Sequence, residues 1–207
     1  MIIRYLGHSA FFIKGEEFSV VTDPYSGIGR KMEKVTADYC LSSHNHYDHN
    51  YFAGVDCKRI ITVPDKKFCG IESFHDSENG RLRGRNTIFK FVLDNVVFCH
   101  MGDIGEYVSS RLIDEIGYVD VLFIPIGGNY TIDWREAVKY IQEINPKIVF
   151  PMHYKTHDSN MDLDTVDKFA KHIAGVERID NEIKISKDDL PLDTAVYIMT
   201  AANFDLK

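Results

Sequence analysis

Four side chains of the kinds that bind metal ions fall within six consecutive residues of this chain. The surrounding segment spans residues 41–50 and reads Leu-Ser-Ser-His-Asn-His-Tyr-Asp-His-Asn. The four side chains are those of His44, His46, Asp48 and His49. Imidazole and carboxylate groups bind zinc and similar divalent ions, and imidazole also suits iron and nickel. Because burying these groups together without a cation would be costly, the cluster predicts a metal site.

The cluster follows an apolar stretch at residues 39–41, which we interpret as the end of a buried strand. Strand ends are where α/β folds build their sites, and this argues against the alternative of an exposed histidine-rich loop. Asp48 and His49 are adjacent and diverge from His44 and His46, so one ion cannot reach all four groups. We therefore expect two ions, one for each pair.

Six further histidines are candidates to complete the two sites. His153 follows an apolar strand at residues 148–150 and is interpreted as a ligand. His157 lies in the next loop and is interpreted as a rim residue, whereas His172 falls on a helix surface. His8 lies between the first two strands, where it could cap a turn or line a pocket.

The remaining candidates also lie near strand ends. His75 follows a strand, although on its own it would be read as an exposed loop histidine. Either His100 or Asp103 could face the metals, and strand alternation argues that only one does, with Gly102 allowing close backbone approach. Asp23 could orient a ligand imidazole or the amides of the metal loop, or could simply begin an Asp-Pro turn.

The order of the predicted elements indicates stacked sheets with helices outside. The first half of the chain contains short β-rich runs and a hairpin turn at Asp94, and strands alternate with helices after Asp103. Helices are expected over residues 106–116, from Asp133 with Glu136 completing a capping box, and around residues 163–173. This order fits an α/β fold, a four-layer αββα sandwich, in one domain over residues 1–207.

Composition narrows the function classes. The chain has 24 Lys and Arg against 31 Asp and Glu, and the net charge of -7 disfavours generic nucleic-acid binding. The first residues read as a strand rather than a signal peptide, and no apolar stretch is long enough to span a bilayer. The four cysteines show no C-x-x-C pairing. They are expected to be reduced thiols in a cytoplasmic protein.

These residues resemble the metallo-β-lactamase superfamily, whose signature H-x-H-x-D-H is matched by residues 44–49. The segments Leu-Gly-His-Ser-Ala, His-Met-Gly-Asp, Pro-Ile-Gly-Gly and Pro-Met-His-Tyr are similar to the branch related to ascorbate-6-phosphate lactonase and N-acyl phosphatidylethanolamine phospholipase D. The resemblance implies two divalent ions, with zinc as the first choice and manganese or iron as alternatives. It assigns the first ion to His44, His46 and His75, the second to Asp48, His49 and His153, and a bridging role to Asp103.

The resemblance implies a hydrolase that acts on a small-molecule ester, lactone or phosphodiester. Two ions would lower the pKa of a water for attack on a carbonyl or phosphoryl centre, with Asp48 orienting this nucleophile and His100 or His8 shuttling protons. Neither G-x-S-x-G nor a P-loop is present. The alternatives are a nuclease of the same fold, a metal-binding partner protein and a di-iron redox enzyme. Redox members typically carry H-x-E-x-D where this chain has His44-Asn-His-Tyr-Asp.

Three arginines at alternate positions follow His75 closely: Arg81, Arg83 and Arg85. They could receive an anionic group of the substrate, such as a phosphate. The alternative is a solvated arginine-rich turn with no role in binding.

Overall fold

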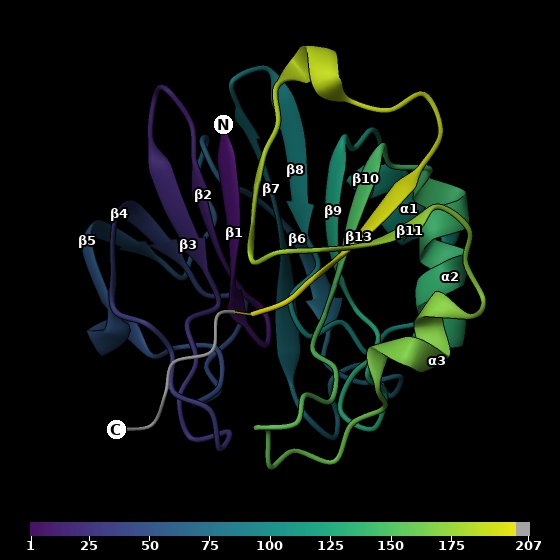
Figure 1. The fold of residues 1–207 in the computed structure, drawn as a ribbon. Coiled ribbons are helices and arrows are strands. Elements are labelled where there is room, and N and C mark those ends of the chain that lie inside the picture. The colour runs from purple at the N-terminus through teal and green to yellow at the C-terminus, as the bar shows by residue number, and fades with distance from the viewer. Residues whose placement is uncertain (202–207) are drawn as a thin grey trace.

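Two mixed β-sheets lie face to face in the computed structural model, which describes residues 1–201 (Figure 1). The first sheet has the order β12 (Glu182–Lys184), β1 (Ile2–Gly7), β2 (Ala10–Lys14), β3 (Ser19–Thr22), β4 (Val35–Leu41) and β5 (Val55–Ile61). The second sheet has the order β11 (Val176–Ile179), β13 (Ala195–Met199), β10 (Ile148–Met152), β9 (Val121–Pro125), β8 (Val96–His100), β7 (Arg85–Leu93) and β6 (Cys69–Phe74). The stacked sheets confirm the predicted sandwich; residues 202–207 of the predicted single domain lie outside the described residues.

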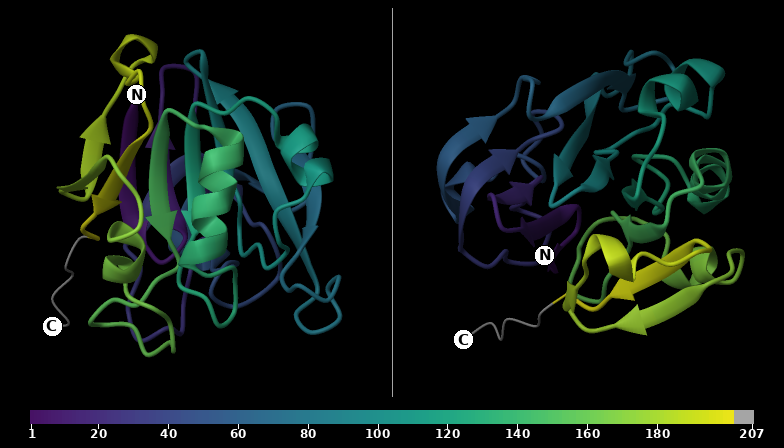
Figure 2. Two further views of the ribbon diagram at one scale, coloured as in Figure 1. Left: turned by 90° about the vertical axis from the view of Figure 1, so that its right-hand side faces the viewer. Right: turned by 90° about the horizontal axis from the view of Figure 1, so that it is seen from above.

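Helices cover the outer face of the second sheet, on the side away from the first (Figures 1 and 2). They are α1 (Ser110–Ile116), α2 (Trp134–Ile144) and α3 (Val166–Ala170). The outer face of the first sheet is covered instead by residues 24–34, with the short 3-10 helix η1 (Phe52–Gly54) beside it. A second 3-10 helix, η2 (Lys187–Asp189), precedes β13. Within residues 1–201, every helix is too short or too polar to cross a membrane.

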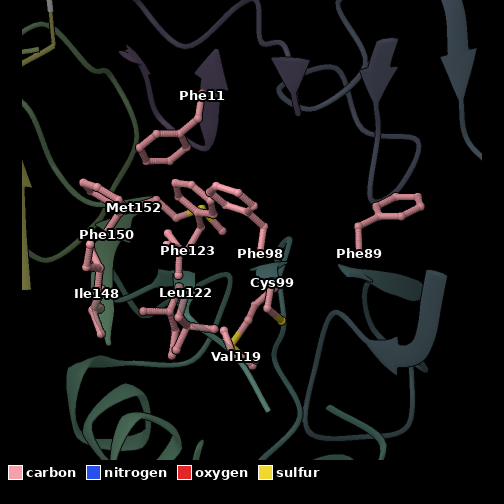
Figure 3. Close-up of a cluster of buried hydrophobic side chains, with 14 of the residues drawn as sticks. Phe11, Phe89, Phe98, Cys99, Val119, Leu122, Phe123, Ile148, Phe150 and Met152 are labelled. Carbon is pink, nitrogen blue, oxygen red and sulfur yellow. The ribbon is translucent and has the colours of Figure 1, made fainter. Parts of the chain in front are cut away.

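Aromatic side chains fill the space between the sheets (Figure 3). Phe11 of β2 points from the first sheet toward Phe123 of β9, with ring centroids 4.4 Å apart. Phe150 of β10 stacks on the same ring at 5.3 Å. Each of these side chains is almost fully buried. Because burial of one such ring contributes about 1.5 to 3 kcal/mol, this cluster holds the two sheets in fixed relation.

The start of α2 agrees with the prediction from local sequence, whereas the start of α1 does not. Asp133 caps α2 as predicted, because its carboxylate accepts hydrogen bonds from the backbone N–H groups of Arg135 and Glu136. The predicted capping box is not formed: the Glu136 carboxylate instead accepts from the backbone N–H of Val108, at 2.7 Å. That contact keeps the chain before α1 extended, so α1 begins at Ser110 and not at residue 106.

Strand direction brings several chain segments to one edge of the sandwich. In the second sheet β7 is antiparallel to both β6 and β8, and β8, β9 and β10 are parallel. The carboxyl ends of β6, β8 and β10 therefore point the same way. In the first sheet β3 and β4 are parallel, so their carboxyl ends also lie side by side. The loops after these strands carry the residues of the candidate site.

Candidate metal centre

The metal loop begins where β4 ends and is fixed to the end of β3. The backbone N–H of Asp23 donates to the carbonyl of Leu41 at 2.9 Å. The Asp23 carboxylate in turn accepts from the backbone N–H and from the hydroxyl of Ser43, both at 2.7 Å. These bonds set the direction in which the chain leaves the strand and enters the His44–His49 segment.

The second sheet supplies three more side chains at its facing edge. His75 follows β6 directly, Asp103 lies three residues beyond β8, and His153 follows β10 directly. All three are buried. Gly102 precedes Asp103 with φ of +56°, and a Cβ there would lie 2.3 Å from Asn86 Oδ1. The predicted close backbone approach at Gly102 is therefore confirmed.

One oxygen of Asp103 lies close to imidazoles from three different loops. Asp103 Oδ2 is 3.0 Å from His49 Nε2, 3.1 Å from His153 Nε2 and 3.3 Å from His75 Nε2. Asp103 itself is held by Asn86, whose Oδ1 accepts from the Asp103 backbone N–H at 2.9 Å. The carboxylate thus occupies the centre of the cluster.

The possible ligand atoms fall into overlapping groups. His44, His46 and His75 form one group, and Asp48, His49 and His153 form a second together with His8; in each group the ligand atoms lie within 4.8 Å of one another. A third group joins Asp103 to His44 and His49. The structure thus brings together all seven predicted site residues, and His8 is a residue that the sequence reasoning left open.

The chemistry of these groups fits divalent metal ions. Two ligand atoms that are each about 2.1 Å from one ion are about 3.0 to 3.4 Å apart at octahedral or tetrahedral angles. The distances from Asp103 Oδ2 to the ring nitrogens fall in this range. Seven buried polar atoms of the cluster have no hydrogen-bond partner among residues 1–201: His8 Nε2, His44 Nε2, His49 Nε2, His75 Nδ1, both ring nitrogens of His153, and Asp103 Oδ1. The close approach of His49 Nε2 to Asp103 is not aligned as a hydrogen bond, and orphaned polar atoms in such numbers call for an ion.

Asp23 orients one imidazole of each group, which fits the role considered from the sequence. Its Oδ2 accepts a hydrogen bond from His49 Nδ1 at 3.0 Å. The same oxygen accepts from the Ser43 hydroxyl, whose oxygen lies 2.9 Å from His44 Nδ1 and accepts from it. Both rings therefore carry the proton on Nδ1 and turn Nε2 toward the cluster. Hydrogen bonds of this kind fix the tautomer of metal-binding histidines.

Electrostatics favour the metal-binding protonation states of His44, His8 and Asp103, but favour protonation of His49. Burial lowers the pKa of His44 to about 3 and that of His8 to about 4. Burial raises the pKa of Asp103, but His153 and His49 outweigh this and hold it well below its ordinary value. Burial lowers the pKa of His49, yet Asp103 and Asp23 raise it well above its usual value. Metal binding would therefore displace a proton from His49.

The other histidines lie outside the cluster. His100 donates from Nε2 to the carbonyl of Ser9 at 3.0 Å and accepts at Nδ1 from the backbone N–H of Gly102. Asp103 rather than His100 therefore faces the other candidates. His157 is exposed, and His172 stacks on Trp134 at 3.9 Å as a surface residue.

Three residues at the site have a strained backbone. His8, Asp23 and His153 have φ values of 54°, 38° and 52°, in the left-handed region that side chains other than glycine rarely adopt. Such residues cost about 1 to 3 kcal/mol each and persist where surrounding contacts enforce them. All three lie directly after strands of the two sheets.

A cleft of about 740 Å³ lies beside the loops that follow β6 and β8, although none of the seven candidate ligands lines it. Its walls include Asp76 and Gly105, which are close in sequence to His75 and Asp103. Asp76 is itself fixed, because its carboxylate accepts four backbone N–H groups of residues 78–83. That loop forms one wall of the cleft.

The comparisons with known proteins agree with this geometry. A family model described as Beta-lactamase superfamily domain matches residues 2–153. This chain belongs to the metallo-β-lactamase superfamily. A metal-dependent hydrolase from Staphylothermus marinus is 31% identical over 191 residues, covering 75% of this chain and 84% of the relative. A candidate Zn-dependent hydrolase of the metallo-β-lactamase superfamily from Thermotoga maritima is 32% identical with a TM-score of 0.80, covering 96% of this chain and 97% of that one.

A more distant structure shares the metallo-β-lactamase fold alone. A metallo hydrolase from Ignicoccus hospitalis is 20% identical with a TM-score of 0.66, covering 100% of this chain and 99% of that one. Together with the closer relatives, the findings confirm that the chain is a metal-dependent hydrolase of the metallo-β-lactamase superfamily.

Proposed function

We propose that this hydrolase uses a dinuclear metal centre to cleave a small-molecule ester, lactone or phosphodiester that carries an anionic group. The observation that carries the proposal is the position of Asp103 Oδ2, within 3.3 Å of ring nitrogens from both ligand groups. A carboxylate placed in this way can bind two neighbouring ions at once.

The residues divide between two ions. His44, His46 and His75 would hold the first, Asp48, His49 and His153 the second, and Asp103 both. When bound, two divalent ions, zinc by preference with manganese or iron as alternatives, supply an activated water and polarise the carbonyl or phosphoryl group under attack.

The chain's own groups prepare the attacking water. Burial raises the pKa of Asp48, but the neighbouring His8 and His49 outweigh this and lower it below its ordinary value. Asp48 is therefore a carboxylate at neutral pH and can accept a hydrogen bond from the water, which fixes its orientation. Its immediate partners are His49 Nε2 at 3.7 Å and His8 Nε2 at 3.4 Å.

Arg83 is the residue of this chain best placed to receive an anionic group of the substrate. Within residues 1–201, Arg81 pairs with Glu78 and Arg85 with Glu72, whereas Arg83 has no acidic partner. Its guanidinium donates to the Asn129 carbonyl and lies over the ring of Tyr130, and it lines the cleft beside the loops that follow β6 and β8. A guanidinium binds phosphate or carboxylate through two parallel N–H groups.

A substrate panel tests this function. Metal-free protein is assayed on lactones, carboxylic esters, small phosphodiesters and single-stranded RNA, before and after loading with zinc or manganese. We expect hydrolysis of at least one small-molecule class that requires the ions and is abolished by a chelator. Cleavage of RNA alone, or turnover that persists with the chelator, would contradict the proposal.

A further inference from the structure

We propose that His8 is an additional protein ligand of the second metal site, beside Asp48, His49 and His153. This inference rests on the proposed dinuclear centre. It concerns a side chain outside the H-x-H-x-D-H segment, contributed by the turn after β1.

The backbone of His8 is fixed from two sides. Its carbonyl accepts a hydrogen bond from the Tyr5 hydroxyl at 3.0 Å and another from the backbone N–H of His153, also at 3.0 Å. The second bond ties the turn after β1 in the first sheet to the end of β10 in the second. Both bonded partners, His8 and His153, are held at positive φ. This backbone hydrogen bond therefore holds the His8 and His153 side chains next to each other.

The His8 ring lies among the residues of the second group. Its centroid is 4.3 Å from that of His153 and 5.1 Å from that of His49. Its Nε2 is 3.4 Å from Asp48 Oδ2, within the separation of about 3.0 to 3.4 Å expected of two neighbouring ligands of one ion. The side chain is buried, and Nε2 has no hydrogen-bond partner in the described part of the chain.

His100 shows what a structural histidine looks like in this protein. It is equally buried, but both its ring nitrogens have hydrogen-bond partners, the carbonyl of Ser9 and the backbone N–H of Gly102. A buried imidazole with a purely structural role is expected to satisfy its N–H in this way. His8 Nε2 has no such partner, since its contact with Asp48 Oδ2 at 3.4 Å does not form a hydrogen bond. An ion shared with Asp48 accounts for both the burial and the unpaired nitrogen.

A fourth ligand would make the two sites unequal. With Asp103 included, the second ion would have five protein donors and the first would have four. Catalytic sites keep an open position for water or substrate, and the site with fewer protein ligands offers more room for it. The residues of the first site, His44, His46 and His75, would therefore leave more room for water or substrate than those of the second.

The test compares wild type with His8→Asn, because asparagine tolerates positive φ and so preserves the turn. His8→Ala serves as the second variant, and His157→Ala is the matched control at an exposed histidine. Metal-free proteins are dialysed against Zn²⁺ or Mn²⁺ of known free concentration, and bound ions per chain are counted by elemental analysis. Titration with Co²⁺, followed by its visible absorption, reports changes in coordination. Melting of the metal-free proteins checks that the variants fold.

We expect wild type and His157→Ala to bind two ions. In both His8 variants one ion should bind more than about 100-fold more weakly, which exceeds the 10- to 100-fold effect of losing a residue that only orients a ligand. The Co²⁺ absorption of that site should change as well. If His8→Asn binds two ions with wild-type affinity, or if its Co²⁺ spectrum is unchanged, His8 is not a ligand. The proposed dinuclear function would still stand. A wild-type protein that binds a single ion would overturn the dinuclear function together with the role of His8.

Discussion

Asp23 Oδ2 accepts a hydrogen bond from His49 Nδ1 at 3.0 Å, between two side chains that are both fully buried. The same carboxylate reaches His44 through the Ser43 hydroxyl. One aspartate at the end of β3 thus fixes an imidazole in each of the two ligand groups. A single residue outside the ligand set should therefore affect both proposed ions.

We expect Asp23→Asn to weaken binding of both ions by about 10- to 100-fold, because the NH2 group that replaces one carboxylate oxygen cannot accept from the donors that face it. Stepwise dissociation constants from equilibrium dialysis measure this. Asp38→Asn is the matched control, since Asp38 makes the same kind of contacts to Ser19 in the first sheet. If the variant weakens the binding of only one ion, the contact through the Ser43 hydroxyl does not orient His44.

Substitution of Arg83 should alter substrate affinity rather than chemistry. For an anionic substrate, Arg83→Ala should raise KM by about 10- to 100-fold with little change in kcat, because a hydrogen bond to a charged group contributes about 1.5 to 3 kcal/mol. Steady-state kinetics on matched anionic and neutral substrates measure the difference. Arg81→Ala removes an exposed residue paired with Glu78 and should leave both KM and kcat unchanged. An unchanged KM in Arg83→Ala would remove this arginine from the binding site.

The stability of the fold should depend on pH through Asp120. Its buried carboxylate accepts from the Val97 backbone N–H at 2.8 Å and from Lys187 Nζ at 2.7 Å, and from the Tyr118 hydroxyl. Burial raises the pKa of Asp120, but Lys187 and Tyr118 outweigh this and lower it. The carboxylate therefore stabilises the fold above the unfolded pKa of about 3.9, and this contribution is lost as pH falls through the lower folded pKa.

Asp120→Asn should accordingly lower the free energy of unfolding at pH 7 by about 1 to 3 kcal/mol. The difference from wild type should shrink as the pH falls below about 4, where the carboxylate of the unfolded chain becomes protonated first, and should be lost as the pH passes the lower folded pKa. Urea unfolding at a series of pH values measures it, with the exposed Asp114→Asn on α1 as control. A difference that stays constant down to the lowest pH would show that the charge of Asp120 is not the source.

The sequence predicted the parts of the site that depend on local order. The spacing of His44 to His49 is visible within one segment. His153 follows an apolar strand, and His75 follows a strand of mixed polarity that ends at the same edge. Strand periodicity left His100 and Asp103 as alternatives. In the structure, the positive φ of Gly102 turns the chain so that Asp103, and not His100, enters the cluster.

The place of His8 could not be predicted in the same way. Its position among the candidate ligands depends on the pairing of its carbonyl with the backbone N–H of His153, a contact between the two sheets that joins distant parts of the chain. The predicted start of α1 was wrong for a similar reason. The Glu136 carboxylate, from a later helix, accepts a hydrogen bond from the backbone N–H of Val108. His8 adopts a positive φ although it is not a glycine, so its residue type did not predict this backbone conformation.

The number of ions bound per chain tests the proposed role of Asp103 as the residue that joins the two metal sites. Metal-free wild type and Asp103→Ala are each dialysed against Zn²⁺ and analysed for bound metal, with circular dichroism to check folding. Two ions are expected in wild type. In Asp103→Ala most of the two-ion occupancy and of the hydrolytic activity should be lost, because Asp103 Oδ2 lies against ligands of both groups. Retention of two tightly bound ions by Asp103→Ala would contradict the account.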